Sequence, residues 1–584
     1  MSLLQHIIQR DLLSKTTLAF SLVGLLVFVF DFGFDQSESI QLTINLFYFL
    51  ILGLGIASTI VRYLTHKDQL KQKVFTFDIL STLIVSSLLI AHFGWVDHDW
   101  MQEDNWLKVA IFLTLIRELF EREINFAMTP LNPAQLFIVS FVTVILMGAL
   151  LLLLPNATYD GITFIDALFT ATSAVCVTGL IVVDTSTYFT TMGQIIILIL
   201  IQIGGLGILT FASYFGYFFR EGSTFQNQLL LRDLTNTQKI SDVFSTIKRV
   251  VMITFVVELL GVFCIYMALD SAQFSSWVDR IYFAIFHSIS AFCNAGFSTL
   301  SNSLLEDGYQ FNYSLHIILV LIFFLGGLGF PIVSNLLTYV RYLFVKFMLK
   351  FRKKIDINRP WIINLDSRIT LITTLILIII GTLGFYFTEY NNTLANHEGI
   401  GKWVTAFFGG MTPRTAGFNT VDMSQLQQST IMLTILLMWI GASPASTGGG
   451  IKTSTFAMAI LNFWALAKGS KKIEIFNREI APISINRAFA IISLSLIVIF
   501  VGVFMIGIFN PELSPTSIVF ECFSAYSTVG LSLGITAKLT TGSKLIVIVI
   551  MFIGRVSMLS ILIALLKQAK HKHYSFPKEE LIIN

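Results

Sequence analysis

Four glycines recur at nearly constant spacing in this 584-residue chain, each after a short stretch of apolar, small and hydroxylated residues. They are Gly179 in SAVCVTGL, Gly296 in SAFCNAGF, Gly417 in TPRTAGF and Gly530 in AYSTVGL. Their separations are 117, 121 and 113 residues (296−179, 417−296 and 530−417), whereas solenoid repeats run to about 50 residues. Each glycine therefore marks a small structural unit, and four such units could surround one axis.

Backbone loops of this kind can bind a dehydrated cation. A potassium ion must lose its water to cross hydrocarbon, and rings of backbone carbonyl oxygens can replace that water. All the carbonyls can point inward only in backbone conformations that favour glycine. A half-helix ending at each loop would add the partial negative charge of its C-terminus. The loops therefore predict a cation filter, with one glycine per loop and more modest selectivity than a channel with four TVGYG loops.

The composition is that of a polytopic membrane protein. Hydrophobic residues make up 55% of the chain, charged residues only 12%, and the mean hydropathy is +0.77, against about 25% charged residues in soluble domains. The net charge of +3 and the absence of a basic run with interleaved aromatics exclude a nucleic-acid partner. The four cysteines lack CxxC spacing, which predicts buried free thiols. The scattered histidines give no catalytic cluster, so we expect no enzyme and no bound cofactor.

Twelve apolar stretches are long enough to be candidate membrane helices, and the first is expected to be a retained helix and not a signal peptide. They lie near 16–34, 40–62, 77–95, 106–120, 133–154, 193–218, 248–269, 314–340, 367–388, 428–466, 485–509 and 543–566. Basic segments at 62–73, 346–359, 468–472 and 567–572 fall on one face. The excess of Lys and Arg on cytoplasmic loops then predicts both termini in the cytoplasm and the glycine loops on the outer half.

Between the two spans of each unit, about 12 residues with helical spacing precede the glycine, too few to cross the membrane. A re-entrant half-helix followed by non-helical backbone fits this pattern, because such backbone is tolerated only where protein or water covers it. An ordinary extracellular loop is the alternative. Asp184 and Asp422 each lie five residues beyond a glycine (184−179 and 422−417), where a carboxylate would concentrate cations at an outer vestibule; the alternative is a solvated surface acid.

The span at 428–466 contains GASPASTGGGIKTST, and a helix cannot continue smoothly through Pro444 and three consecutive glycines. Lys452 and, in the last span, Arg555 are charges at membrane depth, where a functional role is the default. Glu258 and Glu521 also lie in apolar settings, and we expect them to satisfy helix ends and loop amides more than to bind a permeating ion.

The motifs SAVCVTGLIVVDT, SAFCNAGFS, TPRTAGFNTVD and AYSTVGLSLGIT, with GGLG at 204–207 and 326–329, resemble the Trk/Ktr/HKT superfamily of potassium transporters, and the Ktr membrane subunit most closely. The resemblance covers about residues 130–570. It implies four membrane–pore loop–membrane repeats around one pore, potassium uptake into bacteria through the inner membrane, sodium as a frequent activator, homodimers, and a cytosolic ring of nucleotide-binding regulatory subunits of the KTN/RCK type.

The resemblance also implies roles for particular residues. The filter positions it gives are Val177, Thr178, Gly179, Leu180, Asn294, Ala295, Gly296, Phe297, Thr415, Ala416, Gly417, Phe418, Thr528, Val529, Gly530 and Leu531. The gate it gives consists of Ala445, Ser446, Thr447, Gly448, Gly449, Gly450 and Lys452, facing Arg555. Ala445 departs from the family, which commonly has glycine there, and GRVSMLS around Arg555 departs from GRVGPLT.

We expect an all-α membrane protein in which about four extra helices precede four repeats around a pseudo-fourfold pore. The expected segments are 1–128 (N-terminal extension), 129–235, 236–350, 351–470 and 471–570 (repeats one to four) and 571–584 (cytoplasmic tail). A voltage sensor in the extension is a weaker alternative, since only Arg117 lies well inside its span. The expected function is gated potassium uptake through a channel-like pore. The alternative is a sodium- or proton-coupled symporter with alternating access, although the four units share one orientation.

Overall fold

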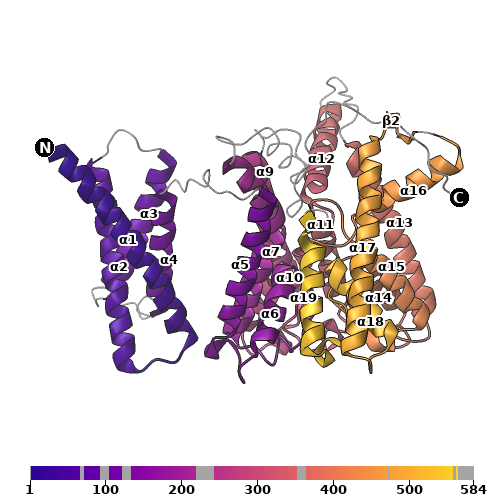
Figure 1. Cartoon of the computed structure of the whole chain (residues 1–584), viewed down its shortest axis with the longest axis horizontal. Coiled ribbons are helices and arrows are strands. Elements are labelled where there is room, and N and C mark those ends of the chain that lie inside the picture. The colour runs from indigo at the N-terminus through magenta and orange to yellow at the C-terminus, as the bar shows by residue number, and fades with distance from the viewer. Residues whose placement is uncertain are drawn as a thin grey trace. The chain divides into compact units, whose positions relative to one another are not determined.

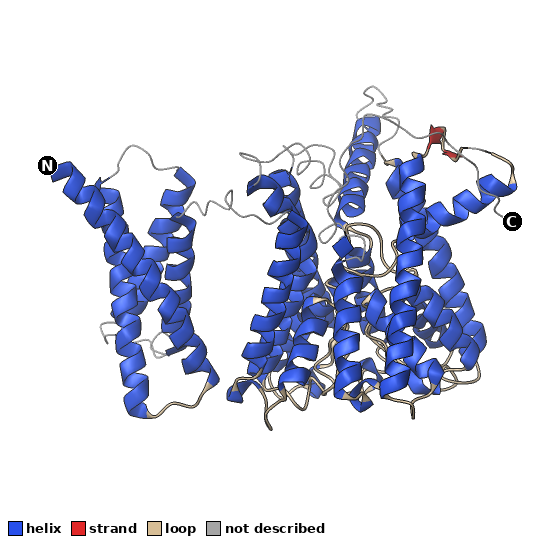
Figure 2. Cartoon of the chain, viewed as in Figure 1, coloured by secondary structure: helices blue, strands red, loops and turns tan. Residues whose placement is uncertain are grey.

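The computed structural model describes residues 2–65, 72–92, 104–121, 133–218, 243–351, 363–470, 472–556 and 561–562. These residues are mostly helical, as the sequence predicts, and form two compact units (Figure 2). The first unit comprises Met1–Phe126 and Leu154–Gly161, and the second comprises Ala127–Leu153 and Ile162–Asn584. The predicted tail at 571–584 lies outside the described residues.

The first unit is a helical bundle. Its elements are α1 (Ser2–Gly33), α2 (Glu38–Thr65), α3 (Gln72–His92), α4 (Asp104–Glu121) and the short 3₁₀ helix η3 (Pro155–Ala157). The Lys108 ammonium lies 3.3 Å from a buried carboxylate oxygen of Asp31, and the Tyr48 hydroxyl donates to the same oxygen at 3.1 Å. A charge among apolar helices needs such partners, because a buried charge without a partner strongly destabilises the folded protein. Lys108 is therefore held in an ion pair with the buried Asp31.

The second unit contains four successive groups of a long helix, a short helix and a second long element (Figure 1). The groups are α5 (Pro133–Leu152), α6 (Phe164–Val175) and α7 (Thr191–Phe218); α9 (Val243–Ala268), α10 (Trp277–Phe292) and α11–α12 (Tyr313–Gly327, Phe330–Phe351); α13 (Leu365–Glu389), α14 (Ile400–Met411) and α15–α16 (Gln428–Trp439, Thr453–Ala467); α17 (Pro482–Phe509), α18 (Pro515–Ser527) and α19 (Thr541–Val556). Minor elements are the 3₁₀ helices η6 (Ser271–Gln273), η7 (Ser303–Leu305), η8 (Met423–Gln425) and η9 (Thr536–Lys538), and a hairpin of β1 (Glu474–Ile475) and β2 (Arg478–Glu479).

The four short helices have 12, 16, 12 and 13 residues. At 1.5 Å per residue, even 16 residues span only about 24 Å, short of a hydrocarbon core of about 30 Å. Local signals start them: the Thr163 and Ser276 hydroxyls accept from the amides of Asp166 and Asp279, and Pro515 occupies the first turn of α18. Within the second unit they lie in the lower half of Figure 1, whereas α12, α16 and the hairpin lie in the upper half.

The second long element of each group packs against the short helix of the next group. The pairs are α7 with α10, α11 with α14, α15 with α18, and α19 with α6. The last pair joins the fourth group to the first. In this pair, the Lys544 ammonium of α19 lies 2.5 Å from the Asp166 carboxylate of α6. The four groups therefore contact one another in cyclic order.

Two of the second long elements are interrupted. The predicted break at 428–466 is found between Trp439 and Thr453. The prediction of one continuous helix at 314–340 is wrong, because α11 ends at Gly327 and the chain bends by 107° before Phe330. Gly329 adopts a positive φ of 83° at the bend, a conformation that glycine takes without steric cost. The apolar run continues through the bend, so hydropathy alone does not reveal it.

Among the described residues, five helices are long and apolar enough to cross a membrane, and the bent pair α11–α12 would make a sixth. Other predicted spans coincide with shorter apolar helices, such as Phe137–Leu152 and Thr191–Gly207. All four cysteines are free, and Cys176, Cys293 and Cys522 are buried as predicted. The prediction for Cys264 is wrong, because it lies exposed on α9, where an apolar surface can face lipid.

Helices α13 and α14 pack through two glycines. A Cβ added to Gly410 would lie 2.5 Å from the backbone of Gly381 and Thr382. We predict that Gly410→Ala destabilises the protein by about 1–3 kcal/mol, the usual cost of overpacking. Thermal unfolding of the purified protein measures this, with Gly507→Ala in α17 as the control, since a Cβ there meets nothing within 4 Å. Equal melting temperatures for the two variants would contradict the close contact.

Candidate functional site

The four glycine loops share one backbone conformation. Their glycines have φ values of 88°, 69°, 82° and 92°, and the residue two positions earlier also has a positive φ. Those earlier residues are Val177 (57°), Asn294 (60°), Thr415 (76°) and Thr528 (50°). A non-glycine residue in this conformation costs about 1–2 kcal/mol, so the surroundings must hold each loop in place.

The loop glycines lie against one another in the order of the chain. A Cβ added to Gly179 would overlap the carbonyl oxygen of Ala295, and a Cβ on Gly530 would overlap that of Thr178, which closes the circle. Between them, a Cβ on Gly296 would lie 2.9 Å from the Gly417 Cα. The carbonyls facing the glycines belong to Thr178, Ala295, Ala416 and Val529. Each glycine thus faces the carbonyl that precedes the next glycine, and no side chain fits at any of the four positions.

A hydroxylated residue at the end of each short helix anchors its loop. Ser173, Ser290 and Ser524 each lie six residues before a glycine (179−173, 296−290 and 530−524), and Thr412 lies five before Gly417. The three serine carbonyls accept from the amide that precedes the glycine at 2.7, 2.8 and 2.9 Å. The Ser173 and Ser524 hydroxyls accept from the glycine amides at 3.1 and 3.2 Å, whereas those of Ser290 and Thr412 donate to carbonyls beyond the glycine at 2.7 and 2.5 Å.

Sequence reasoning missed these four anchors. The pattern Ser-Ala followed by four residues and glycine occurs in three of the four loops and could have revealed them. Among the predicted filter residues, Leu180, Phe297, Phe418 and Leu531 follow the glycines and are at most 2% exposed. The Asn294 side-chain amide lies 2.9 Å from the Thr415 hydroxyl and links two neighbouring loops.

A cavity of about 270 Å³ opens over the loop glycines, all four of which line it. Asp184 and Asp422 line the same cavity, so the structure brings both predicted vestibule acids together with the loops. Each carboxylate also stabilises its own turn, since Asp184 accepts from the Ser186 amide at 2.8 Å and Asp422 from the Ser424 amide at 2.9 Å. The carboxylates are therefore held in fixed positions above the glycines.

The segment between α15 and α16 packs directly against the loops. A Cβ added to Gly448 would overlap the Thr415 hydroxyl, and one added to Gly449 would overlap the Thr528 hydroxyl. Lys452 turns back on this segment, and its ammonium donates to the Gly448 carbonyl at 2.6 Å. The glycines that break the helix are thus those that touch the loops.

Arg555, on α19, links this segment to α7. Arg555 is 5% exposed, and its guanidinium donates to the Thr447 carbonyl and, at 2.6 Å, to the Gly204 carbonyl of α7. Thr447 also donates from its hydroxyl to the Phe292 carbonyl at the end of α10. A cation in an apolar setting needs such acceptors, so the arginine and the broken helix depend on each other.

Ala445 occupies a left-handed backbone conformation that glycine adopts at lower cost. Its φ is 53°, and its carbonyl accepts from the Phe330 amide at 3.1 Å, beside the bend at Gly329. The Ser443 amide donates to the Gly327 carbonyl at 3.0 Å. Two backbone hydrogen bonds therefore join the unpredicted bend of α11–α12 to the predicted break of α15–α16.

The two buried glutamates have different surroundings. Glu521 in α18 accepts from the hydroxyls of Ser532, at 2.8 Å, and Thr536, both beyond the fourth glycine. These partners are hydroxyls and not the loop amides predicted from the sequence. Glu258 in α9 accepts from the Gln202 side-chain amide of α7 at 3.2 Å, a contact between two helices. Among the described residues, no group of His, Cys, Asp and Glu is arranged to hold a metal ion.

Comparison with known proteins identifies the class. Residues 112–574 match the TrkH family, described as cation transport proteins. The chain is 36% identical over 453 residues to Ktr system potassium uptake protein B of Bacillus subtilis, covering 77% of this chain and 96% of that protein. It is 35% identical over 461 residues to the potassium/sodium uptake protein NtpJ of Enterococcus hirae, covering 78% and 97%.

A solved structure supports the fold. The potassium transporter TrkH from Vibrio parahaemolyticus superimposes with a TM-score of 0.61 at 17% identity, covering 84% of this chain and 97% of that one. The chain is therefore a membrane ion transporter, and it belongs to the Trk/Ktr family of potassium uptake proteins, as the sequence resemblance implies.

Proposed function

We propose that the four glycine loops form the selectivity filter of one pseudo-fourfold pore for potassium uptake. The observation that carries the proposal is the closed order of contacts, in which each glycine faces the carbonyl before the next one. A ring of carbonyls can replace the water of a dehydrated potassium ion. The short helices end at the same point and add the partial negative charge of their C-termini.

The cavity above the glycines is the outer vestibule of the proposed pore. Asp184 and Asp422 are its carboxylates, and a cleft lined by negative charge raises the local concentration of cations. The glycine loops then face the outside of a bacterial inner membrane. The ends of α12 and α16, which lead into the basic segments, lie at the opposite end of the second unit from the short helices, which fits a cytoplasmic location for those ends (Figure 1).

The segment from Ala445 to Gly450, with Lys452, is the proposed gate. It packs against Thr415 and Thr528, which precede two filter glycines, and it blocks the inner end of the loops. Arg555 fixes it by holding the Thr447 carbonyl against α7. Opening then requires the segment to leave the loops, which a cytosolic subunit could drive.

The proposed assembly is a homodimer on a cytosolic nucleotide-binding ring of the KTN/RCK type, with no nucleic acid bound. Its support is the similarity to a protein named as part of a Ktr system. Sodium is the proposed activator, and the name of the Enterococcus relative includes both ions. Alternating access is the less favoured mechanism, because the four groups share one orientation and carriers of that class use inverted repeats.

We predict that Gly417→Ser lowers the selectivity for potassium over sodium at least about tenfold, a loss of about 1.4 kcal/mol of discrimination. The new side chain would overlap the Val529 carbonyl and turn it from the axis. Rubidium and sodium tracer fluxes in proteoliposomes measure this ratio. The control is Gly399→Ser, where φ is also positive, at 50°, but a Cβ meets nothing within 4 Å. An inserted Gly417→Ser protein with wild-type selectivity would contradict the filter assignment.

The gate assignment predicts that Arg555→Met raises potassium flux several-fold and weakens its dependence on a regulatory subunit, because the Thr447 and Gly204 carbonyls lose their shared donor. The matched control is Arg280→Met. Arg280 also donates to two carbonyls, those of Tyr266 and Leu269 at 2.6 and 2.7 Å, but at the end of α9. Flux per folded protein decides the matter, and an Arg555→Met protein no more active than the Arg280→Met protein would place the gate elsewhere.

A further inference from the structure

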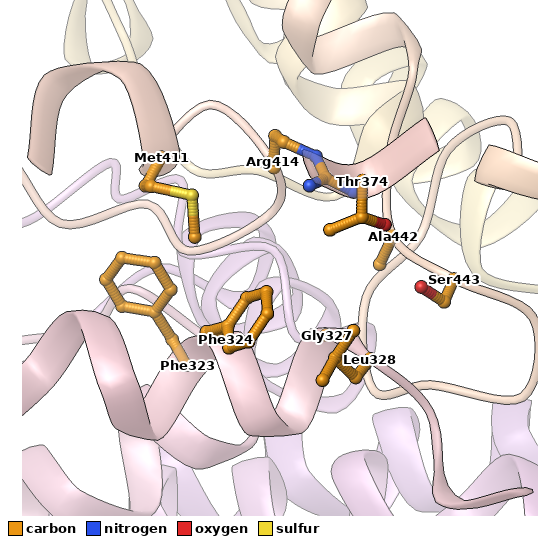
Figure 3. Close-up of a pocket in the computed structure, with 9 residues that line it drawn as sticks. All are labelled: Phe323, Phe324, Gly327, Leu328, Thr374, Met411, Arg414, Ala442 and Ser443. Atoms are coloured by element: carbon orange, nitrogen blue, oxygen red, sulfur yellow. The ribbon is translucent and has the colours of Figure 1, made fainter. Parts of the chain in front are cut away.

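A small pocket lies beside the third glycine loop. Its volume is about 20 Å³, and it is bounded by α11, α13, the end of α14 and the first residues of the broken segment (Figure 3). Phe323, Phe324 and Met411 form one side of it, and Arg414, Thr374 and Ser443 bring polar groups to the other side. About 10–15 Å³ is enough for a single water molecule, so the space has room for one water or one monoatomic ion.

The guanidinium of Arg414 has no partner among the described residues. Its side chain is 8% exposed, it makes no hydrogen bond or ion pair there, and its Nε atom is fully enclosed and unsatisfied. The Nε atoms of Arg555 and Arg280 are unsatisfied too, but the terminal nitrogens of those two residues donate to two carbonyls each, and Arg414 has no such bonds among the described residues. A buried charge is normally paired, and none of the residues that line the space is acidic.

Two hydroxyls that line the same space are also unsatisfied. Thr374 is 2% exposed and Ser443 is fully buried, and neither hydroxyl has a hydrogen-bond partner in the part of the chain that is described. Three enclosed groups that can all donate hydrogen bonds therefore line one small space. A guanidinium N–H and two O–H groups are donors suited to an anion, and one monoatomic anion would satisfy all three and neutralise the charge.

We propose that this space binds a single halide ion, chloride in the cell, as the counter-ion of Arg414. The ion would join three parts of the proposed pore: the third glycine loop through Arg414, α13 through Thr374, and the start of the broken segment through Ser443. Arg414 directly precedes Thr415, whose hydroxyl contacts both Asn294 and Gly448. The bound anion is thus a structural ligand that fixes the position of the gate segment relative to the third filter loop. It lies apart from the path of the permeating cation.

The test is thermal unfolding of the purified full-length protein in potassium chloride, potassium bromide and potassium gluconate at equal ionic strength. A ligand that binds only the folded state stabilises it in a saturable way. We expect the melting temperature to rise by at least ~2 °C with chloride or bromide relative to gluconate, and the rise to saturate. A melting temperature that is the same in all three salts, as for a site filled by water, would overturn the proposal.

Variants locate the effect. Arg414→Met removes the charge and should abolish the response to halide, and Thr374→Val should weaken the apparent halide affinity several-fold. The matched control is Thr370→Val, one turn earlier on α13, whose hydroxyl is equally buried and unpartnered but does not line the space. If Thr370→Val and Thr374→Val respond to chloride alike, the ion does not bind here. The assay needs no ion flux, so its outcome is independent of the pore assignment. If Arg414→Met fails to fold, the comparison of Thr374→Val with Thr370→Val still tests the proposal.

Discussion

The loop glycines approach one another so closely that a single methyl group at any of the four positions would collide with backbone from the next loop. This contact constrains the rest of the second unit. It requires left-handed backbone at each glycine and two residues before it, and that strain requires the hydroxyl anchors at the ends of α6, α10, α14 and α18. The cyclic packing of each second long element on the next short helix brings the four ends to one place.

The same close contact extends to the broken helix. Gly448 and Gly449 lie against the Thr415 and Thr528 hydroxyls because they carry no side chain, and Arg555 then has the Thr447 carbonyl to bind. Ala445 has a φ of 53°, which costs about 1–2 kcal/mol in a residue other than glycine. The proposed filter and gate are therefore packed together, and we expect a substitution in one to alter the structure of the other.

Much of this could be predicted from the sequence, because the decisive constraints are local. One glycine per loop, and a proline followed by three glycines, mark positions where the backbone must leave regular helix whatever surrounds it. The bend at Gly329 was not predicted, because the apolar run continues through it and hydropathy does not report backbone direction. The exposure of Cys264 was missed for a related reason, since lipid-facing and buried apolar positions have the same composition. The cavity at Arg414 depends on packing between segments far apart in the chain, which no local pattern encodes.

The most direct test of the proposed pore is where a potassium-like cation binds. Crystals of the full-length protein grown in rubidium can be measured at the rubidium absorption edge, where the ion's anomalous scattering locates it independently of the protein atoms. The account predicts a rubidium peak on the axis between the four loops, level with the carbonyls of Thr178, Ala295, Ala416 and Val529. A well-ordered structure with rubidium bound elsewhere and none between these carbonyls would contradict it.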